Sequence, residues 1–230
     1  MLFSQAVAQL WVLAWCGTPA QGRWLGATAK SAALREVQGL GSSWTFVLQK
    51  KGVRVWKRGH RGGDEASFAV RACARFDCTP RELAQILLTR DYELIRRFNP
   101  TVVDGTDLEW RDGRKERITY ILTKAVAFLR PRDFVCRVRH EVHGTSELIV
   151  NTPATHARAP SPRRTVRGEL RGTHLVEPAP GGGCLYTCVH EIDPGGAAPR
   201  RLVNWFALRK PLQYMDQLRD VAQETYPPGR

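Results

Sequence analysis

The stretch 129–142, LRPRDFVCRVRHEV, constrains the fold of this chain more than any other part of its sequence. A turn-forming Pro131-Arg132-Asp133 is followed at once by residues that alternate in chemical character. One side of an extended chain here would carry Phe134, Cys136, Val138 and His140, and the other Val135, Arg137, Arg139 and Glu141. This period of two predicts a β-strand over 133–142 with one buried face and one wetter face.

Strand patterns of this kind recur along the chain, and short turns join most of them. They predict eight further strands, at 44–49, from 53 to the turn at 60–63, and at 66–76, 102–110, 115–123, 145–151, 164–175 and 184–192. Runs of strands joined by short turns are typical of an antiparallel sheet, because parallel strands need long crossover connections.

Four segments have the apolar period of a helix instead. They are 24–38, a helix from 80 that Thr79 would cap together with Glu82, a short helix over 91–98, and a long helix over 199–225. Pro211 should kink the long helix. Its apolar stripe must be buried, and we expect it to pack on the concave face of the sheet.

The size of the chain fits one large domain. Its 230 residues, 43% of them hydrophobic, are enough for a substantial core. We expect an apolar N-terminal segment over 1–23 that is a targeting segment or a helix, one domain over 24–226 and a tail over 227–230.

The N-terminal segment leaves the localisation open. Residues 1–16 are apolar but too few to span a bilayer. They resemble the hydrophobic part of a signal peptide, yet the first basic residue is Arg23, which follows them. We expect a cytoplasmic protein that is peripheral at membranes, with secretory or organelle targeting by residues 1–20 as the alternative.

The net charge of +13, with an isoelectric point near 10.0, favours anionic partners. Phospholipid head groups and nucleic acid both fit, and so does a heavy use of arginine for solubility alone. The chain has no nucleic-acid recognition motif, and its aromatic residues fall in apolar stripes and not among the basic residues. We therefore expect an anionic membrane surface and no nucleic acid as partner.

No motif predicts a metal, a cofactor or a catalytic residue. The six cysteines lack paired zinc spacing and are expected to be reduced structural thiols. The six histidines lie in no HExxH or similar cluster, and GxSxG, GxGxxG and P-loop motifs are absent from the sequence.

Six short motifs, in the right order, resemble those of START domains, a family of lipid-binding domains with the helix-grip (Bet v 1-like) fold. They are GVRVWKR at 52–58, TPRELAQIL at 79–87, RRFNP at 96–100, RPRDFV at 130–135, RTVRGEL with HLVEP over 164–178, and LVNWFALRKPLQYMDQLR at 202–219. The resemblance covers roughly 40–224. It implies an α+β fold in which a curved antiparallel sheet wraps around a long C-terminal helix, with two short helices after the third strand.

The resemblance also implies a function: the protein binds one lipid in an internal apolar cavity and transfers or senses it at membranes, as a monomer and without catalysis. The residues expected to line the cavity are Tyr120, Phe134, Cys136, Val138, His140, Tyr186, Cys188, His190, Leu202, Phe206 and Met215.

The loop over 125–129 has two interpretations. The resemblance makes it a lid and membrane-entry loop, in which apolar side chains dip into lipid and arginines meet anionic head groups. The residues with this role would be Val126, Phe128, Leu129, Arg130 and Arg132. The alternative is an ordinary connection between strands whose side chains tuck into the core.

One departure from the family bears on the ligand. Cholesterol-binding members pair an acid with an arginine inside the cavity, and the motif alignment puts Thr119 and Val138 at those positions, or Tyr120 in place of Thr119. Losing both charges together is physically consistent, since one alone would be buried unpaired. The departure argues against a sterol and against a zwitterionic head group held by charge.

Two other functions remain as alternatives. Related helix-grip proteins include polyketide cyclases and hydrolases, and an enzyme in the same cavity would need converging polar groups such as His140, His190 and Tyr186. The sequence offers few such groups. A basic nucleic-acid-binding protein is the second alternative, and it rests on charge alone.

Overall fold

The fold is described from a computed structural model, which defines residues 27–40, 44–59, 68–125, 129–160, 163–196 and 200–227. Side chains at 27–31 and 200–208 are outside the described part of the chain. The expectations for residues 1–26, for Val126 and Phe128, and for the side chains of Leu202 and Phe206 therefore lie outside it as well.

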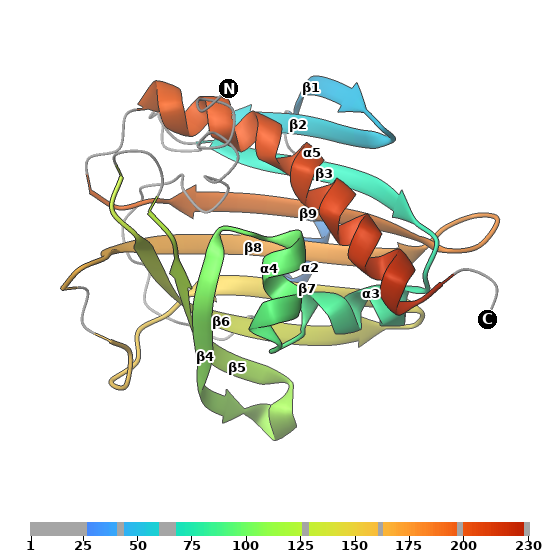
Figure 1. Cartoon of the computed structure of the whole chain (residues 1–230). Helices are drawn as coiled ribbons and strands as arrows, with labels where there is room; N and C mark the ends of the chain where they lie inside the picture. The colour runs from blue at the N-terminus through green and yellow to red at the C-terminus, as the bar shows by residue number, and fades with distance from the viewer. Residues whose placement is uncertain are drawn as a thin grey trace.

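Nine strands of the described chain form one sheet in the order β1-β2-β3-β9-β8-β7-β6-β5-β4 (Figure 1). Their bounds are β1 Thr45–Lys50, β2 Val53–Gly59, β3 Phe68–Phe76, β4 Val102–Arg111, β5 Glu116–Thr123, β6 Arg132–His143, β7 Ser146–Pro153, β8 Val166–Pro178 and β9 Cys184–Asp193. Each neighbouring pair is antiparallel, and β6 also makes a short parallel contact with β8. The predicted antiparallel sheet is confirmed, with strand ends shifted by a few residues.

Both edge strands are irregular. The pairing of β1 with β2 shifts register between Phe46 and Leu48, and that of β4 with β5 shifts between Val102 and Asp104 and again between Asp107 and Glu109. Such bulges bend a strand and interrupt its ladder of hydrogen bonds.

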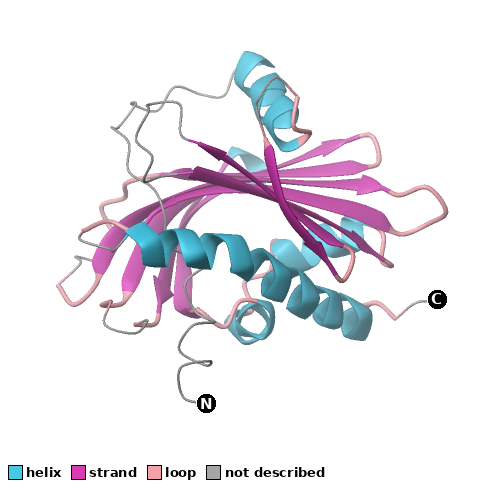
Figure 2. Ribbon diagram, turned by 90° about the horizontal axis from the view of Figure 1, so that it is seen from above, coloured by secondary structure: helices cyan, strands magenta, loops and turns pink. Residues whose placement is uncertain are grey.

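Helices cover both faces of the sheet. Their bounds are α2 Ala27–Val37, α3 Pro80–Leu87, α4 Tyr92–Phe98 and α5 Arg200–Thr225, with a 3₁₀ turn, η2, at Asp112–Arg114. Figure 2 shows α5 crossing one face of the curved sheet with the short helices α3 and α4 on the same side, while α2 lies on the opposite face. This is the predicted α+β helix-grip arrangement. Among the described residues, no helix is long and apolar enough to cross a bilayer.

The start of α3 follows the sequence closely. The Thr79 Oγ1 accepts a hydrogen bond from the Glu82 backbone N–H at 3.3 Å, and the Glu82 carboxylate accepts one from the Thr79 N–H at 2.8 Å. This is the predicted capping box, with Pro80 in the first turn. Asp91 caps α4 in a similar way through the N–H groups of Glu93 and Leu94.

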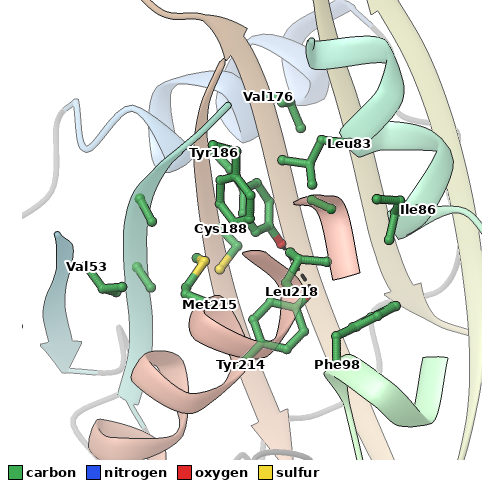
Figure 3. Close-up of a cluster of buried hydrophobic side chains, with 14 of the residues drawn as sticks. Val53, Leu83, Ile86, Phe98, Val176, Tyr186, Cys188, Tyr214, Met215 and Leu218 are labelled. Atoms are coloured by element: carbon green, nitrogen blue, oxygen red, sulfur yellow. Dashed lines mark hydrogen bonds between the residues drawn. The ribbon is translucent and has the colours of Figure 1, made fainter. Parts of the chain in front are cut away.

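The largest hydrophobic cluster lies between the sheet and α5 (Figure 3). Met215 and Leu218 of α5 and Tyr186 of β9 are fully buried there. Edge-to-face ring contacts join Phe76 to Tyr186 and Phe98 to Tyr214, at centroid distances of 5.8 and 6.0 Å. A second cluster beneath α2, with Val37, packs on the other face of the sheet.

The capping box gives a prediction about stability. Thr79→Ala removes the acceptor for the Glu82 N–H, so we expect a loss of about 1 kcal/mol in the free energy of unfolding. Urea denaturation measures it. Thr79→Ser keeps the hydroxyl and should stay close to wild type; equal losses in the two variants would mean that the cap contributes little.

Candidate ligand pocket

A pocket of about 170 Å³ lies between the concave face of the sheet and the helices α3, α4 and α5. Most of its wall is apolar, with side chains from helices and strands such as Leu87, Ile95, Phe98, Ile121, Ile149 and Ile192. Polar groups gather in two places, one near α4 and β5 and one over β7, β8 and β9.

The strand register fixes the second group. Val138 of β6 pairs with Asn151 of β7, Asn151 with Gly172 of β8, and Gly172 with His190 of β9. Residues paired across antiparallel strands point to the same face, so this row crosses the concave face at one level. On β8, His174 lies two residues beyond Gly172 and thus on the same face.

A chain of hydrogen bonds links these side chains. His174 Nε2 lies 3.1 Å from Asn151 Nδ2 and 3.3 Å from His190 Nε2. On its other side, His174 Nδ1 lies 2.7 Å from the Tyr186 hydroxyl, which in turn lies 3.5 Å from the Tyr214 hydroxyl. A buried polar network of this kind is stable only because its members satisfy one another.

Burial keeps both histidines neutral. It lowers the pKa of His174 to about 4, and it lowers the pKa of His190 well below its usual value, with the neighbouring His174 adding to the effect. Burial also raises the pKa of Tyr186 well above its usual value. At neutral pH the cluster offers hydrogen-bonding groups and carries no net charge.

The polar group near α4 is different because it contains a charge. Arg117 lines the pocket, and its Nε lies 3.6 Å from Asp107 Oδ1, with each side chain only 11% exposed. Arg90 also approaches Asp107, at 4.0 Å, and both arginines stack on Trp110 with their guanidinium carbons 5.6 and 5.7 Å from its ring centroid. Burial lowers the pKa of Arg117 below its usual value, and the neighbouring Asp107 opposes that shift.

Seven of the described residues that the sequence predicted for the cavity divide into three groups. Val138 and His190 line the pocket. Phe134 and Cys136 pack beside it with Val138, Ile149 and Ile192. The remaining three, Tyr186, Cys188 and Met215, belong to the main core cluster.

Two further predicted residues, Tyr120 and His140, lie away from the pocket. Tyr120 lies on the other face of β5, where it packs against Leu108, Ile118 and Val135, so Thr119 is the pocket residue on that strand. His140 is on the expected face of β6 but beyond the pocket, where its Nε2 lies 2.5 Å from Glu147 Oε2.

The structure describes three of the predicted loop residues, Leu129, Arg130 and Arg132. Leu129 is 5% exposed and packs with Phe134, as the core alternative expected. Arg132 is 3% exposed, and its guanidinium donates to the carbonyls of Arg130 and Pro194, so it does not face a head group here. Arg130 is exposed.

The sequence interpretation missed Asn151, Gly172, His174, Arg117 and Tyr92. One signal was available: a glycine inside a predicted strand marks a place where other groups approach the backbone closely, and Gly172 does this for the histidine cluster. Gly105, inside the strand predicted over 102–110, gives the same signal for the Tyr92 ring, whereas Arg117 had no comparable signal. All five described cysteines are free and buried, as expected, and no group of three potential metal ligands occurs in the described residues.

Comparisons with known proteins agree with this architecture. The START domain family model matches residues 27–224, so the chain belongs to the START-domain family. Human STARD10 superposes with a TM-score of 0.78 at 18% identity, over 89% of this chain and 82% of that one. Human StAR-related lipid transfer protein 5 does so with 0.75 at 17%, over 87% and 97%.

A bacterial structure is also similar. The STAR-related lipid transfer protein fragment from Xanthomonas axonopodis has a TM-score of 0.67 at 21% identity, over 78% of this chain and 98% of that one. No curated protein matches the chain in sequence.

The buried histidine gives a prediction about pH. In the unfolded chain a histidine has a pKa near 6.5. In the folded protein the pKa of His174 is about 4, so between these two pH values only the unfolded chain binds this proton. The free energy of unfolding should therefore fall as the pH drops from about 6.5 to about 4, with His174 alone contributing roughly 3 kcal/mol.

Denaturant titrations across this range measure the fall. His174→Gln keeps a hydrogen-bonding side chain that does not titrate, and it should remove much of the slope. His143→Gln, at the partly exposed end of β6, is the matched control and should keep the wild-type slope. A wild-type profile that is flat between these pH values would contradict the burial of a neutral His174.

Proposed function

We propose that the protein is a lipid carrier, which binds one lipid molecule in this pocket and transfers it between membranes. The observation that carries the proposal is a largely apolar pocket between the sheet and the helices α3, α4 and α5, in a chain that belongs to the START-domain family. Two similar structures, named as lipid transfer proteins, support it through their shared fold.

A lipid needs more room than the pocket offers. Ligand pockets usually have volumes of roughly 300–1,000 Å³, whereas this one has about 170 Å³. We propose that α5 moves away from α4 to admit the lipid, separating Phe98 from Tyr214 and breaking the surface ion pair between Arg97 and Glu224. Pro211 weakens the hydrogen bonding within α5 and favours a bend there.

We propose binding and not catalysis. An enzyme in this pocket would need a general base that is held and activated by a third group. The hydrogen-bonded chain from Asn151 through His174 to Tyr186 joins an amide, an imidazole and a phenol. Burial lowers the pKa of His174 to about 4, which makes it a weak base at neutral pH. A lipid carrier requires no such base.

We also propose that the carrier is a monomer that acts in the cytoplasm and docks on anionic membranes without binding nucleic acid. The net charge of +13 favours such a surface. The connection between β5 and β6 is the proposed point of contact, because its sequence combines apolar residues with the exposed Arg130. Targeting by residues 1–20 stays an alternative for the location.

Blocking the pocket tests the carrier function. Val138 lines the pocket, so Val138→Phe should fill part of its volume and prevent lipid uptake, at a stability loss of about 1–3 kcal/mol from overpacking. Val142 lies on the same face of β6 but is 60% exposed, so Val142→Phe is the matched control. Native mass spectrometry of bound lipid and transfer between liposomes are the measurements.

We expect bound lipid and transfer in the wild type and in Val142→Phe, and neither in Val138→Phe. A wild type that carries no lipid and transfers none would refute the carrier function. Equal occupancy in both variants would put the lipid elsewhere.

Charge reversal tests the membrane contact. Arg130→Glu should slow transfer from anionic vesicles several-fold, because each basic residue near such a surface contributes about 1 kcal/mol, and added salt should reduce the difference. Arg81→Glu changes the net charge equally at an exposed position in α3, away from this loop. Equal slowing in both variants would point to overall charge and not to the loop.

A further inference from the structure

Gly172 makes the space in which three polar side chains converge. A Cβ atom at this position would lie 3.0 Å from His190 Cδ2 and 3.4 Å from both Asn151 Nδ2 and His174 Nε2. The three side chains come from β7, β8 and β9, and all of them line the pocket. An alanine at 172 would require the His190 ring to shift by a few tenths of an ångström, and a larger side chain would occupy the space in which the three groups meet.

The cluster has hydrogen-bonding capacity that the protein does not use. Asn151 Nδ2 is engaged with His174, but Asn151 Oδ1 is buried and makes no hydrogen bond to the residues that the structure describes. A buried acceptor without a donor is unfavourable, so a ligand that brings an O–H group would gain by supplying one. A hydroxyl suits the site in either orientation of the amide, because it both donates and accepts.

Charge argues against an anionic head group at this place. The described residues that line the pocket include one charged side chain, Arg117, which is already paired with Asp107. Along the row of paired strands, Arg117 pairs with Val138 and Val138 with Asn151, so Arg117 is two strands away, roughly 10 Å at the usual strand spacing. A phosphate or carboxylate beside the histidines would be buried without a counter-charge.

We propose that Asn151, His174 and His190, gathered over Gly172, form a subsite that selects a lipid with an uncharged hydroxyl head group. This inference rests on the proposed lipid-binding function, and it adds the chemical class of the ligand. The apolar side chains Ile149, Leu170 and Ile192 surround the cluster and would contact the hydrocarbon next to the hydroxyl. Val138 separates the subsite from Arg117 along the row.

A series of ligands with one hydrocarbon chain and different head groups tests the proposal. Dodecanol, dodecyl methyl ether and dodecanoate compete at neutral pH with a neutral naphthylamine dye that fluoresces in apolar pockets. We expect dodecanol to bind about tenfold more tightly than the ether, as one net hydrogen bond would give. Dodecanoate should bind more weakly than dodecanol, because its charge would be desolvated.

Substitutions connect this preference to the cluster. Asn151→Leu has a similar shape without the amide, and it should remove most of the preference for dodecanol over the ether. Thr152→Val is the matched control and should leave the ratio unchanged, because Thr152 follows Asn151 on β7 and its side chain points to the other face of the sheet. If Asn151→Leu does not fold, Gly172→Ala replaces it, because the added methyl group should displace the His190 ring from its place in the cluster and lower the same ratio.

The outcomes separate the two proposals. If the wild type binds none of the ligands and no lipid co-purifies with it, the carrier function fails. If all three ligands bind equally, or dodecanoate binds best, the carrier function stands and the hydroxyl subsite is wrong. A preference for dodecanol that survives in both Asn151→Leu and Gly172→Ala would also overturn the subsite.

Discussion

The pairing of β3 with β9 is the contact on which the rest of the structure depends. It joins residues 68–76 to residues 184–193 and so connects the N-terminal hairpins to the other six strands of the sheet. Closing so long a segment costs conformational entropy before any contact forms. Burial offsets that loss, because Ala72, Phe76 and Tyr186 from these two strands pack in the main cluster under α5. The concave face exists only when this pairing is made.

The polar cluster is the exception in that concave face. Hydrophobic residues at positions 151, 174 and 190 would be buried without any need for hydrogen bonds. A buried polar group costs free energy unless it has a hydrogen-bond partner. Here the partners are other polar side chains, and the network ends at an amide oxygen without a donor among the described residues. Real proteins break the rules of core packing mainly at functional sites, which is why this cluster is the most informative part of the pocket.

The local patterns of the sequence predicted the elements well. The alternation of apolar and polar residues predicted the strands, and Thr79 with Glu82 predicted the start of α3. Both signals depend only on residues that are close in sequence. The family resemblance added the helix-grip arrangement, which periodicity could not supply. Boundaries differed by a few residues, as in β6, which begins at Arg132 and ends at His143.

The site was harder to predict because it depends on register and coverage. On β5 the more apolar face, with Ile118 and Tyr120, is buried by the chain around Ala154 and Ala159, and the mixed face with Arg117 and Thr119 lines the pocket. The apolar character of the residues therefore did not predict which face of β5 lines the pocket. Leu129 and Arg132 resembled exposed loop residues in sequence, yet both are buried by parts of the chain that are distant in sequence.

The bulges in β1 and β4 have a consequence for the open form of such a protein. An open sheet has two edges whose free backbone groups can pair with a strand from another molecule, and the risk grows when a core is exposed to admit a ligand. Register shifts at Phe46, Val102 and Asp107 bend both edges away from the straight geometry that a docking strand requires. Irregular edges of this kind disfavour the pairing of strands from two chains.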